Sequence, residues 1–339
     1  MVLDSEGRRQ VQEPTLDAET VTALVEDAAA APSMHNAQPW KFRFLSGART
    51  FHLRADLDRA MPRSDPTNRA LHLGCGAALF NLRVAAAHAG WEPTTRLLPE
   101  PADPTLLASV RLAGPTGPDD LLAALYPAIH RRHTSRFPFD EREIPAGIQA
   151  ELGDAARREG AQLAFPSTWH VETLLDLTHD AEGRETLDPT AFEDVARWTR
   201  IDAATADTAT DGIPAYAFGP RQRDGKAPVR DFAGRRPVAD RGTAAFEHTP
   251  HLALLGTADD QPADWLSAGQ ALERVLLLAT LHGLATSLTS HALESRDLRW
   301  LARDPLTAMA YVQILVRLGY GPEGPATPRR PVRDVLDID

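Results

Sequence analysis

The chain has 339 residues, of which 43% are hydrophobic and 24% are charged, as in a folded globular protein of one large or two ordinary domains. Its net charge of −11, from 36 Lys and Arg against 47 Asp and Glu, argues against general binding to nucleic acid or an anionic membrane. The single cysteine, Cys75, leaves no internal disulfide, and the first residues lack the apolar core of a signal peptide. The most apolar run, residues 275–285, is too short to cross a bilayer. We therefore expect a soluble cytoplasmic protein.

The N-terminal part of the chain predicts a helix, an irregular loop and a hairpin. Residues 17–30 have helical spacing and a capping residue at their start, and residues 41–45 and 51–56 are typical of paired strands. Between them lies APSMHNAQPWKF (31–42), in which a proline near each end keeps the segment out of regular structure. This loop is either an ordinary helix stop whose Trp40 is anchored in the core, or a polar surface that reads the edge of a flat ring.

Two segments far apart in the sequence resemble each other. GAALFNLRVAAAHAG (76–90) aligns without gaps on GQALERVLLLATLHG (269–283), and each has apolar residues at helical spacing and a terminal glycine. Each therefore predicts a buried amphipathic helix. Strand-like runs at 106–114 and 313–321 follow in the same order. We interpret the pattern as a diverged duplication with a boundary near residues 114–120.

A long segment without clear periodicity separates these repeats. Residues 205–245 are rich in Gly, Pro, Arg and Asp, and a loop of this length in a compact chain is usually disordered or functional. Leaving Tyr216 and Phe218 in water would be costly. The segment is either a lid over a pocket or a loop packed on the surface. After it, residues 251–257 predict a buried strand.

Two clusters of basic residues stand out in this acidic chain. They are HRRHTSRFPFD (130–140), with Arg131, Arg132, His133 and Arg136 around Thr134 and Ser135, and PRRPVRD (328–334), with Arg329, Arg330 and Arg333. Guanidinium groups and hydroxyl donors suit a phosphate. Either cluster alone is equally typical of a solvated basic turn.

Four segments together carry a family resemblance. They are PSMHNAQPW (32–40), RHTSR (132–136), GQALERVLLLATLHG (269–283) and RRPVRDVL (329–336). The chain resembles the FMN-dependent nitroreductase superfamily over nearly its whole length, and most closely its Acg-like branch, in which two nitroreductase-like halves are fused. PSxxNxQPW is the most specific of the motifs. The resemblance implies an α+β fold, the nitroreductase-type α/β/α sandwich, internally duplicated as a single-chain pseudo-dimer.

The order of the motifs departs from that of an ordinary nitroreductase, whose basic motif precedes PSxxN and meets it across a homodimer interface. Here the first half carries PSMHN and the second half carries RHTSR, and neither carries both. The resemblance therefore implies one FMN at the junction of an N-terminal half, residues 1–120, and a C-terminal half, residues 121–339. Such a chain needs no partner copy and would act as a monomer, with 205–245 as its lid.

The resemblance also implies thirteen FMN-binding residues. The isoalloxazine ring would be lined by Pro32, Ser33, Met34 and Asn36. The phosphate, ribityl chain and pyrimidine edge would be reached by Arg132, His133, Thr134 and Arg136, and the phosphate clamp completed by Arg329 and Arg330. Flavin N5 would lie beside Leu288, Thr289 and Ser290. The flavin carries the reaction in this family, so no catalytic side chain is expected, and no metal site is recognised.

The implied function is that of an oxidoreductase. NAD(P)H would reduce the FMN, and a nitroaromatic, quinone or similar acceptor would reoxidise it in a ping-pong cycle. The competing hypothesis is a protein that stores or sequesters FMN with little turnover. Two features favour it: the duplication has removed one site, and a proline-rich lid with Tyr216 and Phe218 could fill the space that a nicotinamide needs.

Overall fold

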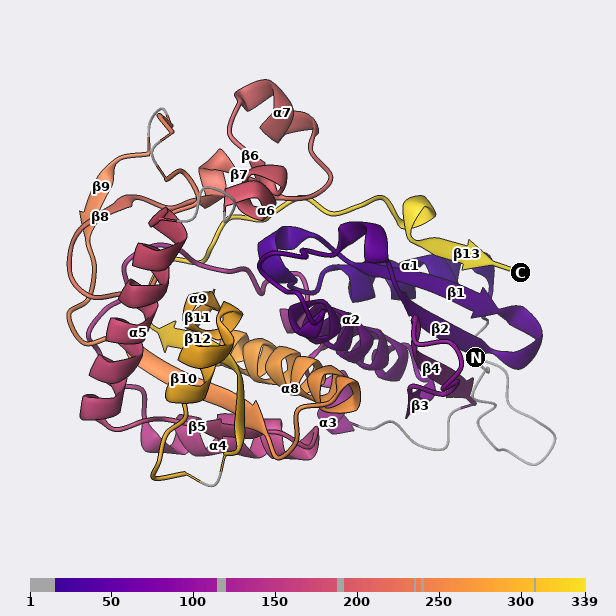
Figure 1. The fold of residues 1–339 in the computed structure, drawn as a ribbon. Coiled ribbons are helices and arrows are strands. Elements are labelled where there is room, and N and C mark those ends of the chain that lie inside the picture. The colour runs from indigo at the N-terminus through magenta and orange to yellow at the C-terminus, as the bar shows by residue number, and fades with distance from the viewer. Residues whose placement is uncertain (1–15, 115–119, 188–191, 235, 239–240, 308) are drawn as a thin grey trace.

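The computed structural model describes residues 16–114, 120–187, 192–234, 236–238, 241–307 and 309–339 (Figure 1). Two β-sheets, each with its own long helix, form most of the protein. The boundary expected near residues 114–120 falls largely on residues 115–119, outside the described part of the chain.

The first sheet has five strands in the order β13-β1-β2-β4-β3, antiparallel except for the parallel pair of β1 and β13. The strands are β1 (Trp40–Leu45), β2 (Thr50–Ala55), β3 (Glu92–Leu97), β4 (Leu106–Ala113) and β13 (Leu336–Ile338). The predicted hairpin is confirmed, with Phe42 opposite Leu53. The C-terminal strand β13 thus joins the sheet of the N-terminal half. A division of the chain at residue 120 would have placed this strand with the C-terminal half.

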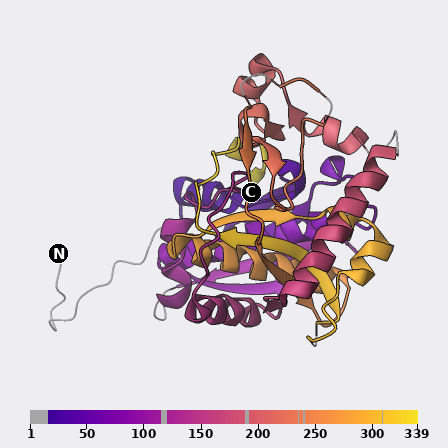
Figure 2. The ribbon, with the colours of Figure 1, turned by 90° about the vertical axis from the view of Figure 1, so that its left-hand side faces the viewer.

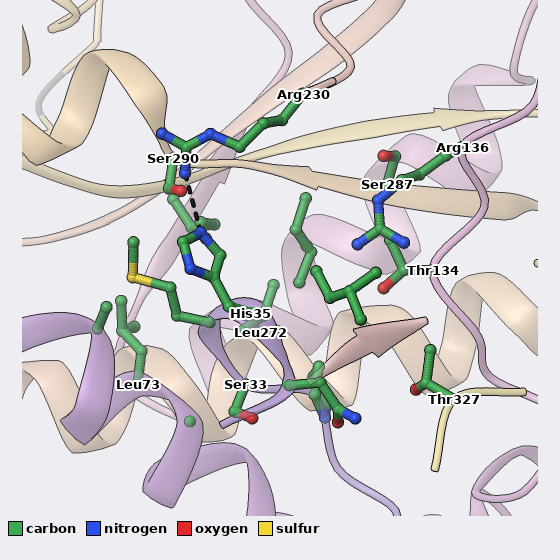
Figure 3. A pocket seen from close by; sticks show the side chains of 18 of the residues that line it. Ser33, His35, Leu73, Thr134, Arg136, Arg230, Leu272, Ser287, Ser290 and Thr327 are labelled. Carbon is green, nitrogen blue, oxygen red and sulfur yellow. Dashed lines mark hydrogen bonds between the residues drawn. The ribbon is translucent and has the colours of Figure 1, made fainter. Parts of the chain in front are cut away.

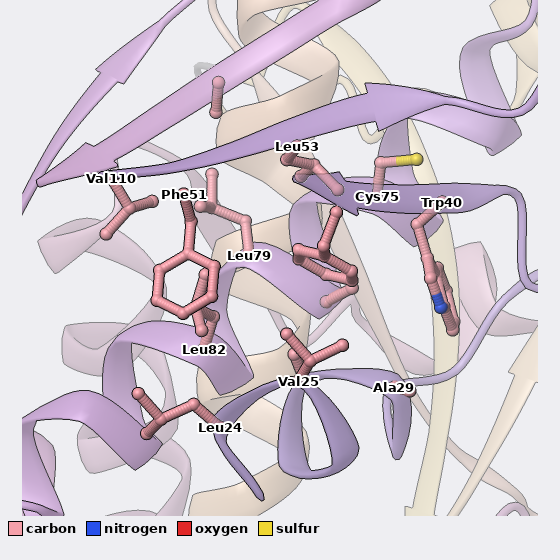
Figure 4. Packing of buried hydrophobic residues seen from close by; sticks show 14 of the residues in the cluster. Leu24, Val25, Ala29, Trp40, Phe51, Leu53, Cys75, Leu79, Leu82 and Val110 are labelled. Atoms are coloured by element: carbon pink, nitrogen blue, oxygen red, sulfur yellow. The ribbon is translucent and has the colours of Figure 1, made fainter. Parts of the chain in front are cut away.

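Helix α1 (Ala18–Ala29) and helix α2 (Arg69–His88) pack against this sheet (Figure 4). Helix α1 begins after Asp17, whose side chain accepts a hydrogen bond from Thr20 N at 2.9 Å and so caps the helix. Strand β1 alternates buried aromatic residues with exposed Lys41 and Arg43. Trp40 is fully buried there, so the QPW end of the irregular loop is anchored in the core.

The second sheet is antiparallel, with strands in the order β11-β12-β10-β5. The strands are β5 (Gln162–Ala164), β10 (His251–Thr257), β11 (Ala285–Thr289) and β12 (Tyr311–Gly319), so the strands expected at 251–257 and 313–321 are confirmed. Its helices are α4 (Ala146–Arg158) and α8 (Pro262–Leu281) on one face, and α5 (Thr168–Leu187), α9 (His291–Glu294) and α10 (Arg296–Leu301) on the other. The short helix α3 (Asp120–Ala123) packs near α2.

Helices α2 and α8 cross at a pair of glycines, Gly76 and Gly269, between the two sheets (Figure 1). A Cβ on Gly76 would lie 2.3 Å from Leu266 O, and a Cβ on Gly269 would lie 2.2 Å from Leu73 O, so only glycine allows this approach. The helices expected over 76–90 and 269–283 are confirmed. Helix α2 begins at Arg69, before the aligned segment, so Cys75 lies inside the helix and is buried.

By length and composition alone, α2 is apolar enough to cross a membrane, with a mean hydropathy of 1.3 over 18 residues. In this fold 83% of that stretch is buried inside the protein. Helix α2 is therefore accounted for as the central helix of the core, and a single such helix is weak evidence for a membrane span.

The segment between α5 and β10 forms a lobe above the two sheets (Figure 2). Its elements are α6 (Phe192–Arg197), β6 (Thr199–Arg200), α7 (Ala203–Thr208), β7 (Ile213–Pro214), β8 (Arg221–Asp224) and β9 (Thr243–Ala245). Residues 205–245 therefore contain more regular structure than the sequence predicts. Phe218 is fully buried, whereas Tyr216 is 52% exposed and its hydroxyl donates to Ala326 O at 3.2 Å.

We expect Gly76→Ala to lower the free energy of unfolding by ~1–3 kcal/mol, because the added methyl group would overlap the backbone of α8. Gly183→Ala in α5 is the matched control. Its Cβ would meet nothing within 4 Å, so the usual helix preference for alanine should stabilise that variant by ~0.5–1 kcal/mol. Urea unfolding measures both, and a Gly76→Ala variant as stable as the wild type would contradict the close crossing.

Candidate functional site

A cavity opens where the N-terminal turns of α2, the strands β11 and β12 and the lobe meet (Figure 3). Its walls carry five arginines and three histidines and, among the described residues, no Asp or Glu. Apolar side chains such as Leu73, Phe232 and Leu272 form much of the remaining surface. The empty space between the walls and across the mouth is about 1140 Å³.

Eleven of the thirteen predicted site residues line this cavity. They are Pro32, Ser33, Met34, Asn36, Arg132, His133, Thr134, Arg136, Leu288, Ser290 and Arg329. The structure therefore brings together the PSMHN loop, the RHTSR segment, the end of β11 and the C-terminal basic segment, which are up to 300 residues apart.

Two predicted site residues lie outside the lining, and their contacts explain why. The Thr289 hydroxyl donates to Pro228 O at 2.7 Å and so holds the lobe instead of facing the cavity. Arg330 donates through Nη1 to Asp56 Oδ2 at 3.2 Å and to Gln38 O at 3.1 Å, on the side of the first sheet. Its expected place in a phosphate clamp is not supported by this geometry.

The PSMHN loop is a short 3-10 turn, Met34–Asn36, in a strained backbone conformation. His35, Asn36 and Gln38 have φ angles of 49°, 55° and 53°, in the left-handed region that side chains other than glycine disfavour. The Ser33 hydroxyl accepts a hydrogen bond from Gln38 N at 2.9 Å and closes the turn. Strain of this kind persists only where surrounding contacts hold the backbone in place.

Asn36 supplies several of those contacts. Its side-chain Nδ2 donates to Gly212 O in the lobe and to Pro328 O in the C-terminal segment, both at 2.9 Å. Its Oδ1 accepts from Arg329 Nη1 at 3.1 Å. The residue therefore joins three segments of the chain, and its amide group is already engaged within the protein.

Arg329 holds the same loop from the other side. Its guanidinium donates to three consecutive carbonyls at the end of α1 and the start of the loop, those of Ala29, Ala30 and Ala31, at 2.9 to 3.2 Å. Burial, with the nearby positive charge of Arg132, lowers the pKa of Arg329 to about 9, so the group is still charged at neutral pH. Its role in this structure is to orient the loop.

Arg136 and Arg69 bring positive charge into the cavity wall, and neither forms an ion pair with a described residue, although Asp65, Asp260 and Glu294 act on Arg69 from farther away. Arg136 Nη1 donates to Ala217 O at 2.9 Å, and its guanidinium lies over the ring of Phe232 at 4.9 Å. Arg69 donates to Gln313 O and, at 3.3 Å, to Leu293 O. Burial lowers the pKa of each to about 10, which leaves both positively charged at pH 7. An anionic ligand would supply the missing counter-charge.

His35 and Arg230 form a buried pair at the edge of the cavity (Figure 3). Burial, then the charges of Arg230 and Arg136, holds the pKa of His35 well below its usual value, so the ring is neutral. A guanidinium can only donate, so Nε2 of His35 accepts the 3.0 Å bond from Arg230 Nη1 and the proton resides on Nδ1. That buried Nδ1 has no hydrogen-bond partner among the described residues.

Several lining residues were not predicted from the sequence. His35 lies inside the PSMHN motif, and His291 directly follows the expected N5 segment, so their positions in the sequence pointed to the site. Arg69 precedes the repeated helix, and only the fold brings it to the cavity. Ile213, Arg230 and Phe232 come from the segment expected to cover the pocket.

The residues present fit FMN by the chemistry of their donors. An anionic ligand would meet buried guanidinium groups, among them that of Arg136, which forms no ion pair with a described residue, and a planar ring would meet apolar side chains and backbone at the PSMHN turn. The Nδ1 atoms of His35 and His291 have no hydrogen-bond partner among the described residues and could bond to a ligand. Glu294, which lies outside the lining, is held in an ion pair with Arg230 at 2.9 Å.

The structure combines a mixed α+β fold with an arginine-lined cavity. Sequence comparison shows that the chain belongs to the nitroreductase family, whose model matches residues 129–320. Two proteins of Mycobacterium tuberculosis H37Rv carry the provisional name NAD(P)H nitroreductase. Rv3131 is 31% identical over 340 residues, covering 99% of this chain and 96% of its own. The protein acg is 30% identical over 332 residues, covering 94% and 96%.

Solved structures of other nitroreductases are more distant. NfnB from sphigopyxis sp. strain HMH, described as FMN and NADPH-dependent, has 16% identity and a TM-score of 0.40, and the match covers 63% of this chain and 97% of NfnB. A nitroreductase from Bacteroides fragilis NCTC 9343 with bound FMN has 15% identity and a TM-score of 0.34, with coverage of 61% and 92%.

We expect Arg329→Met to destabilise the protein by ~3 kcal/mol, because several buried acceptors, among them three backbone carbonyls, would lose their donor. Arg333→Met is the matched control on the same segment. The Arg333 side chain is 84% exposed, so its loss should change stability by less than ~0.5 kcal/mol. Thermal unfolding and the rate of proteolysis within residues 31–38 measure the effect. Equal behaviour of the two variants would contradict the role of Arg329.

Proposed function

We propose that the protein is an FMN-dependent NAD(P)H oxidoreductase of nitroreductase type, with one FMN in the arginine-lined cavity. The main observation behind the proposal is that the described lining holds five arginines and no carboxylate, within a chain of net charge −11. Bound FMN would supply the redox chemistry, accepting a hydride from NAD(P)H and passing reducing equivalents to a nitroaromatic, quinone or similar acceptor. Full-length similarity to proteins named as NAD(P)H nitroreductases supports the proposal.

The protein's own groups would bind and orient the cofactor. Arg132 would meet the phosphate, with the charge of Arg329 beside it, Arg136 would meet the pyrimidine edge of the flavin, and the PSMHN turn would support the planar ring system. His35, neutral and with its proton on Nδ1, can donate a hydrogen bond to a carbonyl or nitro oxygen but is a poor proton donor at pH 7. We therefore assign no acid or base role to a side chain.

We further propose that the chain is a pseudo-dimer that acts as a cytoplasmic monomer. Two observations support an internal duplication. The aligned glycines of the two repeats, Gly76 and Gly269, meet at the crossing of α2 and α8, and each helix packs on its own sheet. The cavity lies across this junction and takes PSMHN from one half and RHTSR from the other. A single chain thus supplies both sides of one site.

We expect Arg136→Met to lower FMN affinity at least tenfold, because a buried charge-assisted hydrogen bond would be lost. Arg131→Met is the matched control, since Arg131 is about half exposed and lies 4.0 Å from Glu323. The visible flavin absorbance per chain after dialysis reports occupancy, with a wild-type value near one. A wild-type ratio near two would show a second site, and equal ratios for the two variants would refute the role of Arg136.

Anaerobic reduction tests the reaction itself. The wild type with bound FMN should lose its flavin absorbance within seconds of adding NADH or NADPH, and an added quinone or nitroaromatic should restore it. Reduction by dithionite but not by either nucleotide would contradict the oxidoreductase. It would favour the alternative, an FMN-storing protein, for which the placement of Ile213, Val229 and Phe232 of the lobe in the cavity wall is the supporting observation.

A further inference from the structure

Glu273 is a fully buried carboxylate behind the cavity wall. It lies on α8 with 0% exposure, and its Oε1 is 3.4 Å from Arg132 Nε. Neither of its oxygens has a hydrogen-bond partner within normal geometry among the described residues. A carboxylate in this setting carries a large desolvation cost, so the structure must offset its charge through its surroundings.

The groups that face Glu273 come from each element packed around it. Arg132 and Arg329 are the charged ones, and both also line the cavity. Asn81 of α2 faces it as a neutral amide and donates to Asp27 O at 3.3 Å. The carboxylate of Asp27 is itself paired with His130 Nε2 at 2.6 Å. On α8, the next residue, Arg274, pairs with Glu159 at 2.9 Å.

Glu273, Arg132 and Arg329 together have a net charge of about one positive unit when Glu273 is ionised and both arginines are protonated. The phosphate of a mononucleotide carries nearly two negative charges at neutral pH. Its arrival would leave a buried cluster with net negative charge, an unfavourable state unless a proton is added. Burial already raises the pKa of Glu273 to about 7, so the carboxylate needs little further perturbation to accept one.

We propose that Glu273 takes up one proton from solvent when a phosphate dianion binds at the Arg132–Arg329 side of the cavity, so that FMN binding and proton uptake are coupled. The inference rests on the proposed function, since FMN is the phosphate carrier. Glu273 does not line the cavity and acts through the arginines, as a positioning residue that balances their charge before the ligand arrives.

Proton uptake on binding makes the affinity for FMN depend on pH. The protonated form of Glu273 binds the anion better, so the dissociation constant for FMN should rise with pH above about 7, by up to roughly tenfold per pH unit, until the pKa of the bound form is passed. Before the anion arrives His133 is neutral in this range, because burial and then Arg132 and Arg329 lower its pKa to about 4, but an anion beside it would raise that pKa, so His133 is the competing group to test. Because the pKa of Arg329 is about 9, both arginines keep their charge up to about pH 8, and the effect is measured between about pH 7 and 8.

Calorimetric titration of the wild-type apoprotein with FMN, at about pH 8 in buffers of different ionisation enthalpy, counts the protons taken up per FMN bound. We expect between about one half and one, and none when riboflavin, which lacks the phosphate, is the ligand. FMN binding without proton uptake would overturn this inference and leave the proposed function standing. No FMN binding at any pH would instead refute the proposed function.

Single substitutions test whether Glu273 is the group that takes up the proton. Glu273→Gln mimics the protonated side chain, so its FMN affinity should be nearly independent of pH between about pH 7 and 8 and, at about pH 8, up to roughly tenfold tighter than that of the wild type. A purely structural role would weaken binding at every pH, which would contradict the proposal. His130→Asn and His133→Asn, which remove two other titratable groups of this region, should each keep the wild-type proton uptake per FMN bound. Loss of the uptake in either histidine variant would place the proton elsewhere and also overturn the inference.

Discussion

The close crossing of α2 and α8 sets the position of everything around the cavity. Because Gly76 and Gly269 let the two backbones touch, the sheets on either side approach each other without a side-chain layer between the helices at this point. The first turns of α2 then reach the junction, where Arg69 and Leu73 line the cavity and Leu73 belongs to the same packed cluster as Leu272 of α8. The same helix supports the PSMHN turn, since a Cβ on Gly74 would lie only 3.1 Å from Ser33 Cβ.

The second constraint is electrostatic. The arginines that reach the cavity are held largely by backbone carbonyls, as Arg329 is by the loop and Arg136 by Ala217 O. A carbonyl satisfies the donors of a guanidinium but does not cancel its charge. The cavity is therefore positively charged before a ligand binds, in a protein that is acidic as a whole, and a bound anion would balance the charge of the guanidinium groups. Two of these arginines do have carboxylate partners: Glu273 lies 3.4 Å from Arg132 behind the wall, and Arg230 is paired with Glu294 and Glu185.

Much of this arrangement could be predicted from the sequence because local patterns carried it. Helical spacing and terminal glycines located α2 and α8, alternation located β1 and β2, and the PSMHN and RHTSR segments identified most of the predicted lining. Side-chain direction at irregular positions could not be predicted. Thr289 and Arg330 stand in the right segments but bond to Pro228 O and Asp56, a choice that depends on tertiary neighbours.

Contacts made by single residues that are distant in the sequence could not be predicted from local patterns either. Arg69 has no motif around it and reaches the cavity only through the fold. Arg230 lies in a segment of low periodicity, yet it joins His35 to Glu294 and to Glu185, at 2.9 and 3.2 Å from the two carboxylates. Glu273 is one charged position in an otherwise apolar helix face, and its meaning depends on two arginines that lie 141 and 56 residues away in the chain.

These contacts also restrict how a second substrate could reach the cavity. The lobe is tied to the PSMHN turn by Asn36, which donates to Gly212 O, and by Gln38, which donates to Thr210 O at 2.9 Å. Displacing the lobe would break hydrogen bonds that hold the strained turn in place, so the lobe and the turn would have to move together. Lobe residues such as Ile213 and Phe232 line the cavity, so the proposed acceptor would have to reach it past these side chains or with the lobe and the turn displaced together.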